Sequence, residues 1–324
     1  MTRAGTTPQT LQAAMERLHQ SGMPGVIVDV DCVDDAHSRW RGAAGLADLD
    51  RGGIPMEVDL DHRVGSIAKT FTAVALLRLV EMGGQVDLDA AIGRYLPDLV
   101  TGARGDAITV RMLAQHTSGL AENLPIIYSS LRSFPPDLSR TSPHSLEEHR
   151  LTHFDRRCLI RTGGTEARET GRPGSLPGAY SNTNYLLLAE LIERITGIAA
   201  EEWITKEVIE RAQLSGTFFP PGTRLEVPHA RLYGSWFTML DPPRDLSEFD
   251  MSWVGTAASL VSTAEDLQRF FGMLIDGELV RPESLRAMQS TVPRHHLRAH
   301  EDRVRSGGAA SSEDARRHRV LGGS

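Results

Sequence analysis

The sequence predicts a mixed α/β protein in which two short strands lead into one central apolar helix. Residues 25–30 and 40–48 have the length and the apolar or small side chains of strands. Residues 66–82 repeat apolar side chains at the three- and four-residue spacing of a helix, and further helical segments follow. With 324 residues, the chain can bury a sizeable core in one large domain or in two intimate ones.

The N-terminal elements are a helix and a pair of strands. Residues 7–21 are predicted to form an amphipathic helix, because one face gathers Leu11, Ala14, Met15 and Leu18. The two strands come next, and a turn over residues 50–53 follows them. We expect the strands to pair in antiparallel fashion and to lead into the central helix.

The central helix is predicted to begin near Ser66 and to end at Gly83 and Gly84. Its apolar side chains cover more of its surface than a helix at the edge of a domain needs, so we place it in the core. One face carries Phe71, Val74, Ala75, Leu79 and Met82, and the apolar surface is widened by Leu76, Leu77 and Val80.

The first turn of this helix carries two polar groups, Ser66 and Lys69. Residues three apart share a helix face, so the hydroxyl and the amine lie side by side. Burial and the positive end of the helix both disfavour the charged form of a lysine. A lysine with a lowered pKa can take the proton of an adjacent serine and make it a nucleophile. The alternative is a solvated serine and lysine at an ordinary helix start.

The rest of the chain is predicted to be mostly helical, with one long irregular stretch. Residues 121–157 contain four prolines and little periodicity, which is typical of a long surface loop that borders a site. A strong helix is predicted over 183–196, with Gly197 as its C-terminal cap. The other expected elements are a short amphipathic piece at 86–96, helices at 108–113, 201–212, 263–275 and 282–288, and an extended segment at 257–262.

A second polar group, Tyr180, Ser181 and Asn182, lies on a turn just before the helix at 183–196. A tyrosine hydroxyl can shuttle a proton when a neighbouring cation lowers its pKa, and an asparagine amide can hold an amide carbonyl. We expect Tyr180 and Asn182 to point into one cleft. The alternative is a helix start capped by Asn182, with a tyrosine that only packs.

Taken together, these segments resemble serine β-lactamases of class C and their relatives, the D,D-carboxypeptidases, penicillin-binding proteins and esterases. The resemblance covers residues 11–288 in order. It rests on VGSIAK around Ser66, ITVRMLAQHTSGL at 108–120, PGAYSNTNYLLLAELIERITG at 177–197 and ASLVSTAEDLQRF at 258–270. It implies a β-lactamase/transpeptidase-like fold, in which helices flank an antiparallel sheet and a helical subdomain is inserted at roughly 85–250.

The resemblance also implies roles for single residues. Ser66 matches the acylated nucleophile, Lys69 the lysine that activates it, and Tyr180 the general base or proton shuttle. Asn182 matches the residue that positions the substrate amide, and His116 matches a structural turn. The backbone N–H of Ser66 is expected to be one oxyanion donor. The implied activity is that of a serine hydrolase that works through an acyl-enzyme, without metal or cofactor, on D-Ala-D-Ala-type peptides, β-lactams or small esters.

The sequence departs from the family pattern near its C-terminus. The family carries a third motif, Lys/His-x-Gly, on a strand after the helix predicted at 263–275, and two more strands and a helix follow. Residues 294–324 contain only four large aliphatic side chains and no periodicity, so we expect a disordered, low-complexity tail after a hydrolase domain at 1–293. The sheet is then expected to lack its last strands.

Two patterns within this tail are not expected to carry chemistry. Arg305, Ser306 and Gly307 resemble the third motif only superficially, because their surroundings are not strand-like. The histidines at 295, 296 and 300 are not expected to bind a metal, because a tail without a fold cannot hold them together. The abrupt change after Pro293 favours a lost reading frame or a truncated product. The alternative to an active enzyme is therefore a catalytically impaired homologue or a binding protein.

Composition limits the partners and the compartment. With 35 basic and 42 acidic residues, the net charge is −7, so nothing argues for nucleic acid or an anionic membrane as a partner. The expected partner is a small-molecule or peptide substrate, and the oligomeric state stays open. We expect no membrane span and no signal peptide, which predicts a cytoplasmic protein, or a periplasmic or extracellular one if the start codon is misassigned. Cys32 and Cys158 are expected to be reduced and free.

Overall fold

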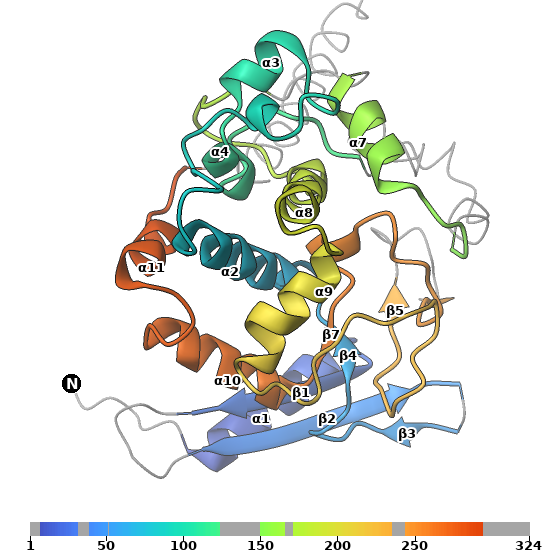
Figure 1. Ribbon diagram of the computed structural model, residues 1–324. Coiled ribbons are helices and arrows are strands. Elements are labelled where there is room, and N and C mark those ends of the chain that lie inside the picture. The colour runs from blue at the N-terminus through green and yellow to red at the C-terminus, as the bar shows by residue number, and fades with distance from the viewer. Residues whose placement is uncertain are drawn as a thin grey trace, which may run out of the picture.

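One helix, α2 (Ala68–Glu81), lies at the centre of the fold, and other helices surround it (Figure 1). In this computed structural model the described residues are 7–31, 39–50, 52–123, 150–165, 171–234 and 244–293. Helix α2 is buried along most of its length, including Phe71, Val74 and Leu79. The prediction that this helix lies in the core is confirmed, whereas Met82 just beyond its end is 52% exposed.

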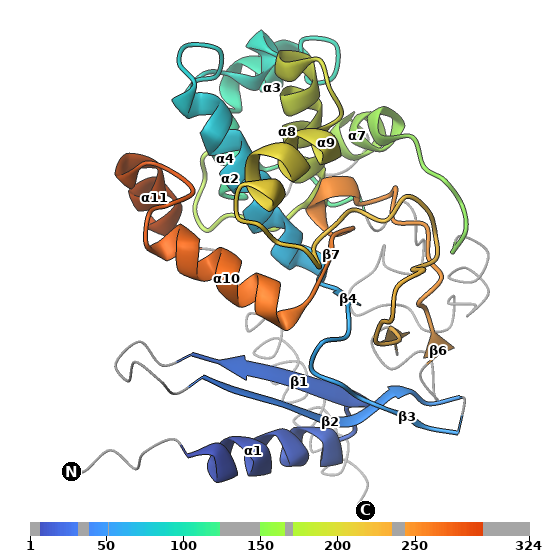
Figure 2. The same ribbon diagram turned by 60° about the horizontal axis from the view of Figure 1, so that its bottom comes forward.

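An antiparallel sheet forms a layer beside this helical part. Strands β1 (Gly25–Val30), β2 (Trp40–Asp48) and β3 (Ile54–Pro55) follow one another in the sheet, and Gly25 of β1 lies opposite Gly45 of β2. Helix α1 (Pro8–Gln20) covers one face of the sheet, and α10 (Ala264–Ile275) lies on the other (Figure 2). Helix α10 joins the sheet to the central helix, because Phe270 stacks on Phe71 with ring centroids 3.8 Å apart.

A short strand pair leads into the start of α2. Strand β4 (His62–Arg63) pairs with β7 (Val261–Ser262), and the Val64 N–H donates to the Leu260 carbonyl at 3.0 Å. The chain then turns sharply at Gly65, whose φ of +55° is strained for any residue with a Cβ. Residues Gly65–Ile67 form a 3-10 turn that runs into α2. This arrangement fixes Ser66 beside the segment that precedes β7.

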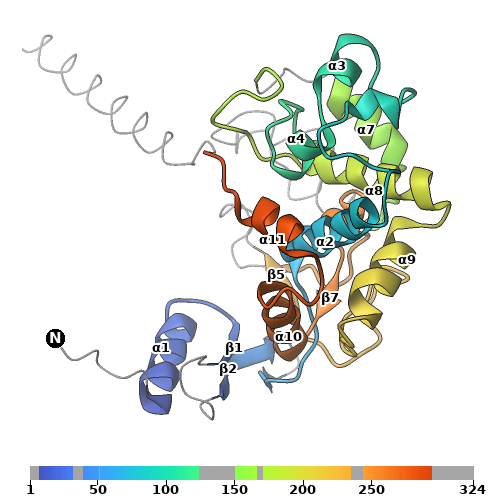
Figure 3. The ribbon, with the colours of Figure 1, turned by 60° about the vertical axis from the view of Figure 1, so that its left-hand side comes forward.

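The helical part gathers around α8 (Asn182–Thr196), which contacts α2 and several other helices. Figure 3 shows this part above the layer formed by the sheet and α1. The other helices among the described residues of this part are α3 (Gly102–Ala107), α4 (Val110–Ala114), α7 (Arg156–Thr165), α9 (Ala200–Ile204) and α11 (Pro282–Gln289). A second strand pair joins β5 (Tyr233–Gly234) to β6 (Arg244–Asp245).

Most of the strongly patterned elements are confirmed. Both N-terminal strands have the predicted bounds and pair in antiparallel fashion, and the mixed α/β class is correct. Helix α1 begins after Thr7, whose hydroxyl caps it, and α10 begins after Thr263 in the same way. Helix α8 ends at Gly197, which adopts the left-handed conformation with φ of +75°.

The weakly patterned segments differ from the predictions. The piece at 86–96 contains only a 3-10 turn at Ile92–Arg94. The helix expected at 201–212 is present as an α-helix over Ala200–Ile204 that continues as a π-helix over Thr205–Glu210. The segment expected to be extended at 257–262 starts with a 3-10 turn, Gly255–Ala257, and only its last two residues form a strand. Helices α3 and α7 were not predicted, because each contains two glycines, which are poor helix formers.

Several predictions lie outside the described residues. Among them are the disordered tail at 294–324 and most of the surface loop at 121–157, of which residues 124–149 are not described. The division of the chain into a hydrolase domain and a tail stays a prediction.

Candidate active site

The start of α2 presents Ser66 to solvent and buries Lys69. Ser66 lies in the 3-10 turn after Gly65 and is exposed, whereas Lys69 lies in the first turn of α2 and is only 6% exposed. The Lys69 Nζ donates to the Ser66 Oγ at 3.2 Å. The two side chains are therefore neighbours, as their spacing of three predicts.

The amine of Lys69 has three oxygen acceptors, and none of them is a carboxylate. Besides the Ser66 hydroxyl, Nζ donates to Asn182 Oδ1 at 2.8 Å and to the carbonyl oxygen of Ala257 at 2.9 Å. The second acceptor begins α8, and the third lies in the segment before β7. Three separate parts of the chain thus converge on one amine.

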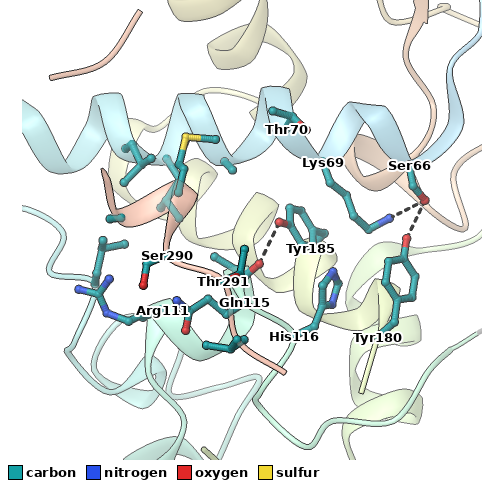
Figure 4. Close-up of a pocket in the computed structure, with 18 residues that line it drawn as sticks. Ser66, Lys69, Thr70, Arg111, Gln115, His116, Tyr180, Tyr185, Ser290 and Thr291 are labelled. Atoms are coloured by element: carbon teal, nitrogen blue, oxygen red, sulfur yellow. Dashed lines mark hydrogen bonds between the residues drawn. The ribbon is translucent and has the colours of Figure 1, made fainter. Parts of the chain in front are cut away.

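Tyr180 completes the group from the turn before α8. Its hydroxyl lies 2.6 Å from the Ser66 Oγ, and either oxygen can be the donor. The same hydroxyl also lies 3.4 Å from Asn182 Oδ1. Figure 4 shows Lys69 and Tyr180 approaching Ser66 from two sides. The structure therefore brings together all four predicted site residues, Ser66, Lys69, Tyr180 and Asn182.

Burial dominates the electrostatics of the group. It lowers the pKa of Lys69 to about 8, and the negative charge of Glu122 partly opposes this shift. The Lys69 amine also lies over the ring faces of Tyr180 and Tyr185, at 4.8 Å and 5.5 Å from the centroids. Burial thus brings the pKa of Lys69 closer to neutral pH than that of an exposed lysine.

Glu122 is a member of the site that the sequence did not reveal. Its carboxylate accepts from the Asn182 backbone N–H at 2.7 Å and from Asn182 Nδ2 at 3.1 Å. The first bond places a negative charge on the N-terminus of α8, where Ser181 gives no side-chain cap. The second fixes which way the amide of Asn182 faces, so that Oδ1 points to Lys69. Asn182 is the first residue of α8 and not its N-cap.

His116 packs against the ring of Tyr180 and supports the site. It has a φ of +58° and its ring stacks on Tyr180 with centroids 4.4 Å apart. Its Nδ1 accepts from the Ser181 backbone N–H at 3.2 Å and lies 3.1 Å from Asn184 Nδ2. The expected structural turn at His116 is therefore also a support for Tyr180, and the ring is only 6% exposed.

A cavity of about 580 Å³ opens beside the group. Figure 4 shows Ser66, Lys69 and Tyr180 at one end of it and Arg111 and Ser290 toward the other. Within the described residues, no three or more His, Cys, Asp or Glu side chains are placed to hold a metal ion. The three tail histidines, and the Arg305 segment, lie outside the described residues.

Comparison with known proteins identifies the family. The sequence model of the β-lactamase family matches residues 9–320, which is nearly the whole chain. The chain belongs to the β-lactamase family. The resemblance drawn from the sequence motifs is confirmed, and the matched range extends beyond residue 288, where that resemblance ends.

Members of the wider β-lactamase superfamily share the fold. A D-stereospecific amidohydrolase from Streptomyces sp. superposes with a TM-score of 0.73 at 31% identity, over 89% of this chain and 78% of that one. The β-lactamase/transpeptidase-like fold with helices and antiparallel strands is thus correct.

Two curated relatives match shorter stretches of this chain. Protein flp of Staphylococcus aureus strain MW2 is 25% identical over 211 residues, which are 64% of this chain and 37% of that protein. The human mitochondrial serine β-lactamase-like protein LACTB is 30% identical over 119 residues, which are 35% of this chain and 21% of that protein. The chain thus matches well under half of the length of either relative. In the described part of the chain, no helix has the length and apolarity needed to cross a membrane.

Proposed function

We propose that this protein is a serine hydrolase that forms an acyl-enzyme on Ser66. The observation that carries the proposal is the environment of Lys69. The amine is buried, has a pKa of about 8, and contacts the Ser66 hydroxyl at 3.2 Å. A base with a pKa near the working pH, within hydrogen-bond reach of the nucleophile, is what activation of a serine requires.

The acceptors around Lys69 also orient its lone pair. A neutral amine keeps two N–H bonds, and Asn182 Oδ1 and the Ala257 carbonyl offer two acceptors at 2.8 and 2.9 Å. When both are engaged, the lone pair turns toward the third neighbour, the Ser66 hydroxyl. Loss of one proton from Lys69 thus changes it from a donor to Ser66 into its base.

Tyr180 is the second candidate for proton transfer. Its hydroxyl lies 2.6 Å from the Ser66 Oγ, and the Lys69 amine lies 4.8 Å from the centroid of its ring. The exposed position of Tyr180, at 41%, suits a group that delivers the proton to a leaving group in the cleft.

The reaction then has two steps. In the first, Ser66 Oγ bonds to the substrate carbonyl carbon, its proton passes to Lys69 or Tyr180, and the bond to the leaving group breaks as that group takes up the proton. In the second, water adds to the acyl carbon and gives up a proton to Lys69 or Tyr180, and the ester bond to Ser66 breaks as the Ser66 Oγ takes up that proton. The Ser66 backbone N–H, at the start of a helical turn, is the proposed oxyanion donor.

The substrate is proposed to be a D-Ala-D-Ala-type peptide, a β-lactam or a small ester. The 31% identical Streptomyces relative is named as a D-stereospecific amidohydrolase, which supports an amide of D configuration among these. The same serine, lysine and tyrosine serve all three chemistries, so the shape of the pocket decides among them.

The proposal is tested by covalent labelling. A fluorophosphonate probe should add to Ser66 and raise the intact mass of the protein by one adduct. Ser66→Ala should abolish the adduct, whereas Ser21→Ala, which changes an exposed serine after α1, should retain it. Labelling that persists in Ser66→Ala would remove Ser66 from the proposed role.

The second candidate is a homologue that acylates slowly or only binds its ligand. It is favoured by one observation: the described residues include no Lys/His-x-Gly strand that could give a second oxyanion donor. Loss of one such donor lowers turnover by about 10²–10³. Stoichiometric labelling without turnover of any ester, amide or β-lactam would favour this candidate.

A further inference from the structure

A row of three buried polar side chains ends at the ring of Tyr180. The Ser118 hydroxyl donates to Asn184 Oδ1 at 2.6 Å, and Asn184 Nδ2 lies 3.1 Å from His116 Nδ1. The imidazole of His116 then stacks on the phenol ring, and both rings are seen side by side in Figure 4. All three side chains of the row are buried, and Asn184 is fully shielded from solvent. The row therefore links the interior of the helical part to a group that contacts the nucleophile.

Two backbone N–H groups fix the direction of every hydrogen bond in this row. The Ser181 N–H donates to His116 Nδ1 at 3.2 Å, so Nδ1 is an acceptor and carries no proton. The group of Asn184 that faces Nδ1 must then be its NH2 group, and its Oδ1 faces Ser118. At the other end, the Leu120 N–H donates to the Ser118 Oγ at 3.1 Å, and the hydroxyl gives its own proton to Asn184.

One form of the His116 ring fits this pattern. A neutral imidazole has one N–H, and because Nδ1 accepts from two donors, that proton lies on Nε2. A proton on Nδ1 would face two N–H groups in a buried place and would break both hydrogen bonds. The φ of +58° at His116 also constrains the backbone that carries the ring. The row thus fixes both the place of the imidazole and the nitrogen that carries its proton.

The imidazole holds the turn that carries two of the four site residues. Its Nδ1 binds the backbone N–H of Ser181, which lies between Tyr180 and Asn182, and its ring lies 4.4 Å from the phenol ring, measured between centroids. Tyr180 is 41% exposed, so packing on its solvent side cannot hold it in place. Its hydroxyl must nevertheless stay within 2.6 Å of the Ser66 Oγ. A shift of about 1 Å in a reacting group can lower a rate about 10²-fold.

We propose that His116 is the positioning residue of Tyr180, and that Asn184 keeps its ring in the Nε2–H tautomer. The inference rests on the proposed acyl-enzyme mechanism and adds how the second proton-transfer group of that site is held. His116 gives no proton to the substrate and takes none from it, since it acts through the place of the Tyr180 hydroxyl. The acceptors of Lys69 are Ser66, Asn182 and Ala257, which do not belong to the row, so the base should keep its place when the row is disturbed.

The tautomer is tested by NMR of the full chain with isotopically labelled histidine nitrogens, at about pH 8, where an ordinary histidine is neutral. The signals of His116 are those that His116→Asn removes. The parent should show a proton on Nε2 and none on Nδ1. Asn184→Asp replaces the NH2 group by an oxygen, and an acidic side chain suits this position in the first turn of α8. In that variant the proton should move to Nδ1, because an acceptor now faces it.

A double-mutant cycle tests whether the row acts through Tyr180. Asn184→Asp should lower the rate of fluorophosphonate labelling of Ser66 about tenfold in the parent. In Tyr180→Phe it should lower that rate less than about twofold, because no hydroxyl is left to misplace. A general loss of stability would act equally in both backgrounds. Gln213→Glu, an amide-to-acid change at an exposed position, is the matched control and should have no effect in either. Should Asn184→Asp fail to fold, His116→Asn removes the ring instead and should give the same pattern, since asparagine tolerates a φ of +58°.

The outcomes separate this inference from the proposed function. Labelling of Ser66 at a rate that Asn184→Asp leaves unchanged, or lowers by the same factor in both backgrounds, would overturn the role of His116 alone. A parent ring with its proton on Nδ1 would do the same. Absence of labelling in the parent would overturn the proposed function and this inference with it.

Discussion

Lys69 and Arg156 are two cations that the fold holds largely away from water, and both contact helix α8. Lys69 is 6% exposed, and the side chain of Arg156 is 20% exposed. Lys69 meets a hydroxyl, an amide oxygen and a backbone carbonyl. Arg156 instead meets carboxylates: Glu193 at 2.6 Å, Glu201 at 3.2 Å and Glu190 at 3.9 Å.

The groups around each cation decide whether its pKa is lowered or raised. Burial lowers the pKa of both side chains, and for Lys69 it prevails, so that the pKa falls to about 8. For Arg156, the charges of Glu201 and Glu193 together outweigh burial and raise the pKa. A buried cation among neutral oxygens is poised to lose its proton, whereas one among carboxylates is a fixed structural charge. The comparison supports the proposal that Lys69 takes part in the reaction, and it indicates that Arg156 stabilises the fold.

The largest expected effect tests the proposed role of Lys69 as the base that activates Ser66. Lys69→Arg keeps the positive charge but removes the base, because guanidinium does not lose its proton in proteins. We expect the rate of Ser66 acylation to fall on the order of 10⁴, the upper end for a general base. Stopped-flow measurement of fluorophosphonate labelling checks this. Lys206→Arg changes the other lysine of the chain, which is exposed, and should react like the parent. A Lys69→Arg variant that acylates within tenfold of the parent would contradict the role of Lys69.

Arg156→Met tests the other side of the comparison, the proposed contribution of Arg156 to stability. It leaves Glu193 and Glu201 without their cation in a partly buried site, so we expect the free energy of unfolding to fall by about 3 kcal/mol. Lys69→Met should change it by less than about 1 kcal/mol, because loss of three hydrogen bonds is offset by removal of a poorly solvated charge. Urea denaturation measures both. Arg286→Met, at an exposed ion pair with Glu283, is the control and should have almost no effect. Equal losses at positions 69 and 156 would remove the distinction.

Tyr180→Phe asks whether Lys69 has a partner in proton transfer. Only a hydroxyl is lost, and the ring can still stack on His116, so the fold should be preserved. We expect turnover to fall about 10²-fold, the lower end for a general acid–base group, since Lys69 remains in contact with Ser66. Tyr233→Phe removes a hydroxyl between β2 and β5 and should leave turnover unchanged. Turnover of Tyr180→Phe within twofold of the parent would leave Lys69 as the base without help.

The two cations also differ in what the sequence could predict. Lys69 was found because its partner Ser66 is three residues away on one helix, and local spacing is visible in a sequence. Helices α8 and α10 and strands β1 and β2 were found for the same reason, since periodicity and caps are local. Arg156 was not found, because its carboxylates are 34, 37 and 45 residues away along the chain, and only the packing of α7 and α9 on α8 brings them together.

Within the site, too, contacts between residues far apart along the chain could not be predicted from the sequence. Glu122 and the Ala257 carbonyl reach Asn182 and Lys69 across the fold, and no local pattern marks a backbone carbonyl as a ligand of a lysine. Glu122 lies three residues after the HTSG turn, at the point where the predicted surface loop begins, so nothing in the local sequence distinguishes it from other loop carboxylates. The family resemblance assigned roles to the residues of its motifs and to no others.

The smallest expected effect concerns Glu122, a carboxylate whose negative charge acts on Lys69. Its charge favours the ammonium form and so raises the pKa of Lys69 against the larger effect of burial. Glu122→Gln removes this charge, and the pKa of Lys69 should then fall below about 8. Because the base must be neutral, activity in the parent declines as the pH drops through that pKa, and in Glu122→Gln the decline should begin at lower pH. The maximum of kcat in the same titration should also fall, because glutamine has one oxygen for the two Asn182 donors. The pH profile of kcat/KM for an ester measures the shift, and Glu16→Gln on α1, beyond the sheet, should show none. An acid limb that stays in place or moves to higher pH would mean that Glu122 only positions Asn182 and α8, and that burial alone sets the pKa of Lys69.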